Sequence, residues 1–256
     1  MAPYDILGNI AIVKFKTGVK IKEKKLFATE LLRRHTSVKG VLEKTSRFKG
    51  RLRTLKTKWV LGEKTKEVLY KENGCVFRFN VDSCYFSPRL ASERLKIAGM
   101  IGGGEKVLVM FGGVAPYAIV IAKNSYPKKI VSIELGRECN KYARENVRRN
   151  KAEEKIKLIR GDVRKEIPAL DEKFDRIIMA RPNLKDSFLD SAFLCIKKKG
   201  IIHYYFFCKE EEIASIKRNI LKEGLENGKK VKILKVKKAG DIGPYNYRWR
   251  ADLKVS

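Results

Sequence analysis

The sequence predicts an α/β fold with a mostly parallel sheet, preceded by a small α+β domain. From about residue 104 onwards, apolar runs of strand length alternate with segments of helical spacing, which is typical of a parallel sheet. Before about residue 80, the apolar runs are shorter and are separated by turns. We therefore expect a small domain at 1–80, a connecting segment at 81–104 and a large domain at 105–256.

The small domain is expected to contain a helix and a hairpin. Apolar residues recur at helical spacing within Lys22–Arg34, which predicts a helix. Apolar and polar residues alternate over Cys75–Phe79, after a turn at Glu72–Gly74, which predicts a hairpin strand. Further short apolar runs complete this domain: Ile10–Phe15, Val38–Leu42, Leu52–Leu55 and Val68–Tyr70.

In the large domain, strands and helices are expected to alternate, and the chain is expected to end in two antiparallel strands. The expected strands are Val107–Phe111, Ile130–Leu135, Ile156–Arg160, Phe174–Met179 and Gly200–Phe207, then Val231–Lys237 and Tyr247–Val255. The expected helices are Pro116–Ala122, which begins with a proline suited to a first turn, Arg137–Asn150, Lys185–Ile196 and Glu210–Glu223.

The charge balance indicates a polyanionic partner. The chain has 58 Lys and Arg against 29 Asp and Glu, a formal net charge of +29. Nucleic acid is favoured over an anionic membrane surface, because no basic amphipathic helix or lipidation signal stands out. No signal peptide and no apolar stretch of membrane-spanning length is evident, so we expect a soluble cytoplasmic protein, and no obligate protein partner is indicated.

The cysteines and histidines give no sign of a metal site. The five cysteines lack CxxC spacing and mostly lie in apolar runs, so we expect buried, reduced thiols. His35 and His203 have no companion at metal-ligand or catalytic spacing. His203 lies in an apolar run, where a packed core histidine is the favoured interpretation. We therefore expect no metal.

Three strand ends carry residues suited to an adenosine cofactor. Gly112 and Gly113 follow the first strand and precede a helix, where the backbone can approach a ligand closely. Glu134 ends the second strand, where a carboxylate can accept ribose hydroxyls, and Asp162 follows the third. Each signal alone is often structural, but together they favour such a cofactor.

S-adenosylmethionine is favoured over NAD. The loop lacks the G-x-G-x-x-G pattern of dinucleotide sites, and the methionine carboxylate and sulfonium suit this shorter loop. Val109 and Ala115 stand where methyltransferases commonly carry an acidic residue and a glycine, so the methionyl end is expected to be held in an unusual way.

The chain resembles the archaeal and eukaryotic tRNA (guanine-37-N1)-methyltransferase family, which includes wyosine-pathway enzymes. The specific part is Tyr85–Arg94, with the sequence Tyr-Phe-Ser-Pro-Arg-Leu-Ala-Ser-Glu-Arg. Further segments agree in order and spacing: Tyr4–Ile12, Met110–Val114, Ile133–Glu134, Gly161–Val163 and Gly200–Tyr205. The resemblance covers nearly the whole chain from the small domain onwards, so we expect the additional N-terminal domain that many archaeal members use to check the tRNA elbow to be absent.

The resemblance implies a class I, Rossmann-like methyltransferase domain that binds S-adenosylmethionine. Tyr85 and Arg89 would border the cofactor, with Arg89 near its carboxylate. Phe111 would pack on the cofactor, Glu134 would bind ribose and Asp162 would lie at the adenine. The implied cofactor-binding residues that follow the strands are Phe111, Gly112, Gly113, Glu134, Leu135, Asp162 and Val163.

The resemblance also implies catalytic residues. Glu93 would remove the proton from guanine N1, which is a poor nucleophile while protonated. Arg53 would face the exocyclic oxygen, where negative charge develops, and Pro182 belongs to the motif after the fourth strand. Two plainer interpretations remain open: Arg89 and Glu93, four residues apart, could form a helical ion pair, and Arg53 could contact a phosphate.

One departure from the family pattern bears on the target base. Members that make 1-methylguanosine usually carry Asn-Leu-Pro or Asn-Pro-Pro after the fourth strand, where this chain has Ala180-Arg-Pro182. Without the asparagine, C-methylation of the tricyclic base 4-demethylwyosine, in tRNA-Phe, is nearly as well supported as N1-methylation of guanine. In either case the expected partner is the anticodon stem-loop of a tRNA.

Two other functions stay open. Aminocarboxypropyl transfer, the reaction of a related wyosine-pathway enzyme, is disfavoured because Arg89 and Glu93 are both present. A catalytically degenerate RNA-binding protein would explain the substitutions Val109, Ala115 and Ala180. The candidate RNA-contacting segments are 47–53 and 245–250, although Trp249 in the latter could instead pack inward.

Overall fold

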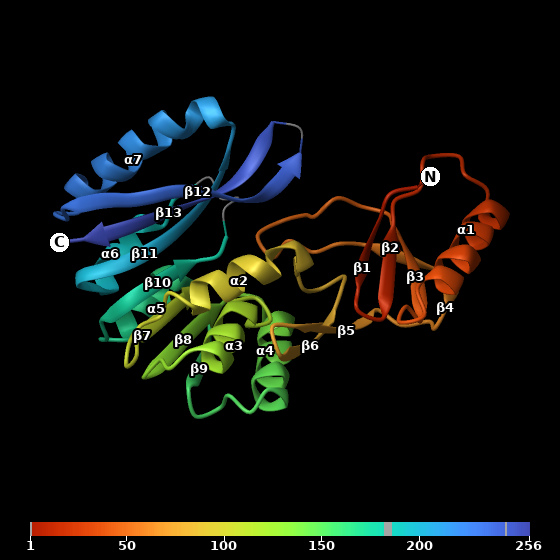
Figure 1. The fold of residues 1–256 in the computed structure, drawn as a ribbon, viewed down its shortest axis with the longest axis horizontal. Helices are drawn as coiled ribbons and strands as arrows, with labels where there is room; N and C mark the ends of the chain where they lie inside the picture. Colours follow the sequence, from red (N-terminus) through yellow and green to blue (C-terminus); the bar gives the residue numbers. More distant parts are fainter. Residues whose placement is uncertain (1, 182–185, 244) are drawn as a thin grey trace.

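The computed structural model describes residues 2–181, 186–243 and 245–256. Its larger part is a seven-stranded sheet, drawn on the left of Figure 1. The strands of this sheet are β7 (Lys106–Met110), β8 (Lys129–Glu134), β9 (Ile156–Arg160), β10 (Phe174–Met179), β11 (Ile196–Cys208), β12 (Val231–Gly243) and β13 (Asn246–Val255).

The sheet is mostly parallel, and successive strands are added first on one side of β7 and then on the other. The strand order is β12-β13-β11-β10-β7-β8-β9, with β7 to β11 parallel to one another and β13 antiparallel to both of its neighbours. The chain moves from β7 outward to β9 and then returns to β10 on the other side of β7. Sheets of this kind bind ligands at the carboxyl ends of the strands beside such a reversal.

Helices cover both faces of this sheet (Figure 1). Alternate residues of β7 point to opposite faces, as a strand requires. Val107 and Val109 enter a core shared with α3 (Pro116–Asn124) and α4 (Arg137–Arg149), while Leu108 and Met110 enter a core shared with α5 (Val163–Ala169), α6 (Leu189–Cys195) and α7 (Ile213–Glu226). The predicted α/β fold is confirmed.

The smaller part, on the right of Figure 1, is a four-stranded sheet with one helix. It consists of β1 (Tyr4–Leu7), β2 (Ile10–Val13), β3 (Gly40–Lys44), β4 (Thr57–Gly62) and α1 (Ile21–Arg34). Ala28 and Leu31 of α1 pack in one apolar cluster with Val13 and Val41 of the sheet. The predicted helix at Lys22–Arg34 therefore agrees with α1.

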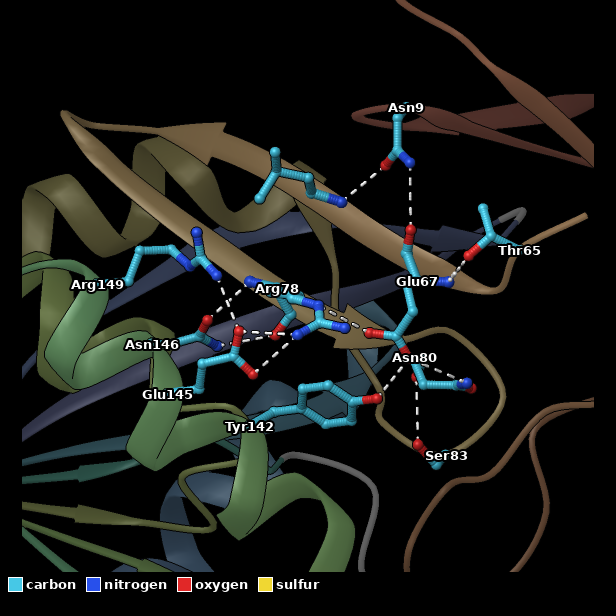
Figure 2. Close-up of polar contacts among 11 residues, drawn as sticks. Asn9, Thr65, Glu67, Arg78, Asn80, Ser83, Tyr142, Glu145, Asn146 and Arg149 are labelled. Carbon is cyan, nitrogen blue, oxygen red and sulfur yellow. Dashed lines mark hydrogen bonds and ion pairs between the residues drawn. The ribbon is translucent and has the colours of Figure 1, made fainter. Parts of the chain in front are cut away.

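A hairpin lies between the two sheets and is tied to both. Its strands, β5 (Glu67–Glu72) and β6 (Cys75–Asn80), are joined at the predicted turn. In Figure 2, the Asn146 side chain of α4 bonds both backbone groups of Arg78, while Asn9 bonds backbone groups of the other strand. Arg78 and Glu67 also pair at 3.1 Å. The hairpin thus connects α4 with the small sheet, and the division at residue 80 stays a prediction.

Some elements differ from the sequence-based expectation. Within the described residues the predicted helix at 185–196 begins only at Leu189, because Phe188 has φ +59, in the left-handed region that interrupts a helix. β12 continues to Gly243, six residues beyond its predicted end. The short helices α2 (Ala91–Ala98) and α5, and strands β1 and β4, were not expected.

Several side chains lie where the sequence placed them. The five cysteines are buried and free, and His203 is only 1% exposed. Trp249 packs inward and donates from Nε1 to the Cys208 carbonyl at 3.1 Å, which confirms that alternative. No helix in the described part of the chain is both long and apolar enough to cross a membrane.

Candidate active site

The turn after β7 approaches the neighbouring strand closely. A Cβ atom at Gly112 would lie 2.1 Å from Oγ of Ser132, so only glycine fits there without displacement. Phe111, Gly113 and Ala115 all adopt positive φ angles of 57–67°, which shapes the tight turn that precedes Pro116. The sequence motif therefore has a structural cause that is independent of any ligand.

Glu134, at the end of β8, faces this turn. Its Oε2 accepts from the backbone N–H of Gly113 at 2.8 Å, and its Oε1 accepts from that of Gly136 at 2.7 Å. A carboxylate has about four lone-pair sites, so both oxygens retain capacity for further donors. Glu134 can therefore fix the turn and still accept the hydroxyls of a ribose.

These residues line a cavity at the carboxyl ends of β7, β8 and β10. The strand-end cavity, as we name it, has a volume of about 760 Å³ including its open mouth. Its walls include the predicted cofactor residues Phe111, Gly112, Gly113 and Glu134. The unexpected lining residues include Arg94, Tyr117, Ala180, Arg181 and Arg248. The position beside β7 is the one that the strand order favours for a ligand.

Asp162, Val163 and Leu135 are not among the residues that line this cavity. Asp162 caps α5 and pairs with Arg51 at 2.8 Å, and Arg51 does line the cavity. The hydrogen bond from Arg51 lowers the pKa of Asp162 below its usual value. Val163 is buried, and Leu135 is exposed on the surface. Their roles in cofactor binding stay predictions.

Tyr85 and Arg53 lie where the cavity meets a second, larger depression. The broad groove, of about 1710 Å³, runs between the small sheet and the β12–β13 hairpin, and both residues line both hollows. The Arg53 guanidinium lies 3.8 Å from the centre of the Tyr85 ring. Burial would raise the pKa of Tyr85, but Arg53 and Arg248 outweigh it and hold the pKa below the usual value.

Glu93, the predicted proton acceptor, is buried on α2 and lines neither hollow. Its Oε1 accepts from the Tyr205 hydroxyl at 2.9 Å and from Arg250, and Lys237 lies 3.8 Å from its Oε2. The Tyr205 ring lies 6.1 Å from the ring of Tyr117, which lines the strand-end cavity. Glu93 is thus close to the cavity but separated from it by tyrosines.

A buried polar network continues from Glu93 across the sheet. Arg250 donates to both oxygens of Asp252, at 2.7 and 3.0 Å, and Asp252 contacts Nδ1 of His203 at 2.6 Å. Arg176 lies 3.0 Å from Nε2 of His203. Burial lowers the pKa of His203, so the ring is neutral. Since Arg176 can only donate, the ring proton resides on Nδ1 and faces Asp252.

Arg89 does not pair with Glu93. Its guanidinium is exposed, contacts Asp5 at 2.7 Å and lines the broad groove rather than the strand-end cavity. The helical ion pair that the spacing allowed is therefore wrong: the two side chains point to different partners. The predicted contact of Arg89 with a cofactor carboxylate stays a prediction, and Pro182, the third predicted catalytic residue, lies outside the described residues.

Three arginines have positions that sequence reasoning did not assign, although Arg248 and Arg250 belong to the candidate RNA-contacting segment 245–250. Arg181 and Arg248 line the strand-end cavity, and Arg250 holds Glu93. One signal was available for two of them. Arg248, Arg250 and Asp252 alternate with apolar residues in a strand that was expected inside a sheet, which places charges on one buried face.

Comparison with known proteins now identifies the family. Residues 68–234 match the model of the TRM5/TYW2 methyltransferase domain. The chain belongs to the TRM5/TYW2 methyltransferase family. This membership confirms the family that the sequence motifs indicated, and with it the assignment as a methyltransferase.

Individual members of the TRM5/TYW2 family are similar over almost all of the chain. The tRNA (guanine(37)-N(1))-methyltransferase Trm5b of Pyrococcus abyssi is 34% identical over 99% of this chain and 74% of the relative. The tRNA (guanine(37)-N(1))/4-demethylwyosine(37)-methyltransferase Taw22 of Nanoarchaeum equitans is 32% identical over 98% of both. A solved complex of aTrm5 and tRNALeu has a TM-score of 0.86 and 30% identity, covering 99% of this chain and 72% of that one.

Proposed function

We propose that this chain transfers the methyl group of S-adenosylmethionine to the purine at position 37 of a tRNA, beside the anticodon. The observation that carries this proposal is the meeting of two hollows at Arg53, Tyr85 and Arg248. One hollow is enclosed by strand ends and suits a small cofactor. The other is broad and suits a polymer, and a nucleotide at their junction would be within reach of both.

The residues of the strand-end cavity fit the cofactor. Glu134 offers acceptors for ribose hydroxyls, and the Phe111 ring, in edge contact with Phe188 at 5.2 Å, provides an apolar wall. Arg94, already paired with Glu72, adds a buried positive charge to the wall. When bound, the cofactor supplies an electrophilic methyl group.

The broad groove has the character of an RNA-binding surface. Lys44, Arg53, Arg89 and Arg248 supply positive charge to its walls, and such groups bind phosphates. Phe48, 38% exposed, lies 4.8 Å beneath the ammonium of Lys44 and offers a surface for a base. We therefore place the anticodon loop in this groove.

A guanine accepts a methyl group at N1 only after N1 loses its proton. We keep Glu93 as the proton acceptor, because the path from the cavity to its carboxylate is short: it runs past Tyr117 and Tyr205. The Arg250 guanidinium pairs with the Glu93 carboxylate, and the Lys237 ammonium lies 3.8 Å from its Oε2. Arg53, at the cavity mouth, can stabilise the negative charge that moves to O6.

The second candidate target is 4-demethylwyosine. Ala180, in the cavity wall at the end of β10, has a small apolar side chain that leaves room for a third ring. Taw22, which is similar over 98% of both chains, carries both activities in its name. We therefore propose guanine and 4-demethylwyosine as the two candidate target bases of one site.

The decisive experiment is methyl transfer to two tRNA preparations. The purified protein is incubated with S-adenosylmethionine and tRNA-Phe that carries either guanosine or 4-demethylwyosine at position 37, and the nucleosides are analysed by mass spectrometry. We expect a mass increase of one methyl group at position 37, release of S-adenosylhomocysteine, and no reaction of a transcript with adenosine 37.

Three outcomes would contradict the proposal in different ways. Release of methylthioadenosine with a modified base would indicate aminocarboxypropyl transfer. Normal cofactor binding by calorimetry without any transfer would indicate an RNA-binding protein with a degenerate site. Methylation of another nucleotide would overturn the assignment of position 37.

A further inference from the structure

The wall of the strand-end cavity contains guanidinium groups with unused donors. Arg248 is 6% exposed and Arg181 is half-buried, and Nε of each is inaccessible to water without a hydrogen-bond partner among the described residues. A buried donor that lacks an acceptor costs roughly 1–3 kcal/mol. Such a cost at two positions that line one cavity indicates that a ligand supplies the acceptors.

The charges around these donors also favour an electron-rich ligand. Burial lowers the pKa of Arg181; the Glu134 carboxylate opposes this shift, and repulsion from Arg53 and Arg51 adds to it. Burial likewise lowers the pKa of Arg53, with Arg248 contributing repulsion. The nearby Glu134 already accepts from two backbone N–H groups, and Ala180 supplies no polar group. Glu134 is the one carboxylate among the described residues that line this cavity, against five arginines.

The shape of the cavity selects a planar ring over a phosphate. Where the cavity meets the broad groove, Tyr85 and Leu90 line both hollows and provide apolar surface, which suits the faces of a base turned out of its stack. The phosphodiester backbone of a polymer remains in the broad groove outside. Among bases, guanine presents two acceptors, O6 and N7, on one edge, and the guanidinium fork matches that pair.

We propose that Arg181 and Arg248 bind the O6 and N7 edge of the target purine and thereby restrict the site to 6-oxopurines. This inference rests on the proposed function. The tricyclic base keeps both acceptors, because its third ring is built on N1 and the 2-amino group. The same two arginines therefore serve both candidate substrates, and they exclude adenine, which has a donor at position 6.

The test compares binding of anticodon stem-loops that differ only at position 37. RNAs with guanine, hypoxanthine or 2-aminopurine at this position are titrated with the protein in the presence of S-adenosylhomocysteine, and fluorescence anisotropy gives each Kd. Hypoxanthine keeps O6 and N7, whereas 2-aminopurine lacks O6. We expect the wild-type protein to bind the first two RNAs equally and the third about tenfold more weakly.

In the variants Arg181→Leu and Arg248→Leu, this preference is expected to fall to about twofold or less. Arg248→Lys keeps the charge in the buried strand but not the fork, so it is expected to retain the overall affinity and to lose the preference. Arg47→Leu, an exposed arginine that lines neither hollow, is the matched control. It should weaken binding of all three RNAs equally.

A tenfold preference that persists in both leucine variants would overturn the inference. So would an undiminished preference combined with loss of S-adenosylhomocysteine binding by calorimetry, because the arginines would then hold the cofactor. A wild-type protein that methylates position 37 but binds all three RNAs equally also contradicts it. Failure of the proposed function itself looks different: no methyl transfer and no dependence on the base at position 37.

Discussion

Arg250 pairs with Glu93, which precedes it by 157 positions, and both side chains are almost completely buried. Asp252 also accepts from the arginine, and His203 contacts Asp252. This arrangement holds the predicted proton acceptor in one orientation. Each of the two buried charges also loses a partner if the other is removed, which leads to the first prediction.

Replacing Arg250 by methionine should strongly destabilise the fold. The change leaves the Glu93 carboxylate buried beside Tyr205 with only Lys237, 3.8 Å away, as a counter-charge. Breaking a buried pair in this way typically costs about 3–5 kcal/mol. Urea unfolding of the two proteins at pH 7.5 measures the loss.

The double variant Arg250→Met/Glu93→Gln is the control. Because it removes the unpaired charge, it should be more stable than Arg250→Met alone by at least about 1 kcal/mol. Equal stability of the single and double variants would show that Arg250 acts through packing or through Asp252 rather than through Glu93.

The turn after β7 should not tolerate a single methyl group. In Gly112→Ala, the new Cβ would lie 2.1 Å from Oγ of Ser132, and the next atom, Cβ of Ser132, would be at an ordinary 3.5 Å. We expect a loss of roughly 1–3 kcal/mol, as for other overpacked sites. Removing the obstructing hydroxyl in Gly112→Ala/Ser132→Ala should restore most of it in thermal unfolding, and a double variant as unstable as the single one would refute this account.

Cofactor affinity should depend on Glu134. In Glu134→Ala, the acceptor proposed for the ribose is lost, and the N–H groups of Gly113 and Gly136 lose their partner. Hydrogen bonds to charged groups contribute about 1.5–3 kcal/mol, so calorimetry should show a Kd for S-adenosylhomocysteine that is roughly ten- to a hundredfold higher. Glu138→Ala, exposed four residues further on, is the matched control. An unchanged Kd in Glu134→Ala would place the cofactor elsewhere.

Stability should fall as the pH drops below about 6.5, because His203 must gain a proton in the unfolded chain but resists it in the fold. Burial lowers the pKa of His203 below its usual 6.5. The unfolded state therefore binds the extra proton first, and stability declines by up to about 1.4 kcal/mol per pH unit between 6.5 and the lowered value. The neighbouring Asp252, whose pKa burial would raise but His203 and Arg250 lower, stays charged throughout this window.

Urea unfolding at pH 7.5, 6.5 and 5.5 measures this dependence. The variant His203→Gln should flatten the curve in this interval, whereas His35→Gln, at the other histidine, should leave its slope unchanged. A wild-type curve that is already flat between pH 6.5 and 5.5 is incompatible with a neutral, buried His203.

The sequence was sufficient to predict the sheet and one side of the candidate site. Hydrophobic spacing located the strands from β7 to β13, and the residues at the ends of β7 and β8 indeed line one cavity. These predictions succeed because parallel strands end at a common edge of the sheet. Residues that directly follow such strands in the sequence therefore lie close together.

The other side of the site could not be predicted in this way. Glu93 and Arg250 meet only because β13 inserts beside β11, and no local pattern fixes that pairing. Arg89 illustrates the same limit, since its partner Asp5 belongs to the small sheet. The directions of long charged side chains depend on contacts between distant segments. The spacing of residues along the sequence indicates only which residues are close within one helix or strand.

The last strand to be synthesised, β13, completes the candidate site. This strand contributes Arg248 to the cavity wall and Arg250 to Glu93, yet it is synthesised after every other element of the sheet. A ribosome-bound chain that has released β7 to β10 already contains the glycine turn and Glu134, but not these arginines. The carboxylate of Glu93 therefore gains its buried partner, and the cavity wall its last arginine, only when the final strand has left the ribosome.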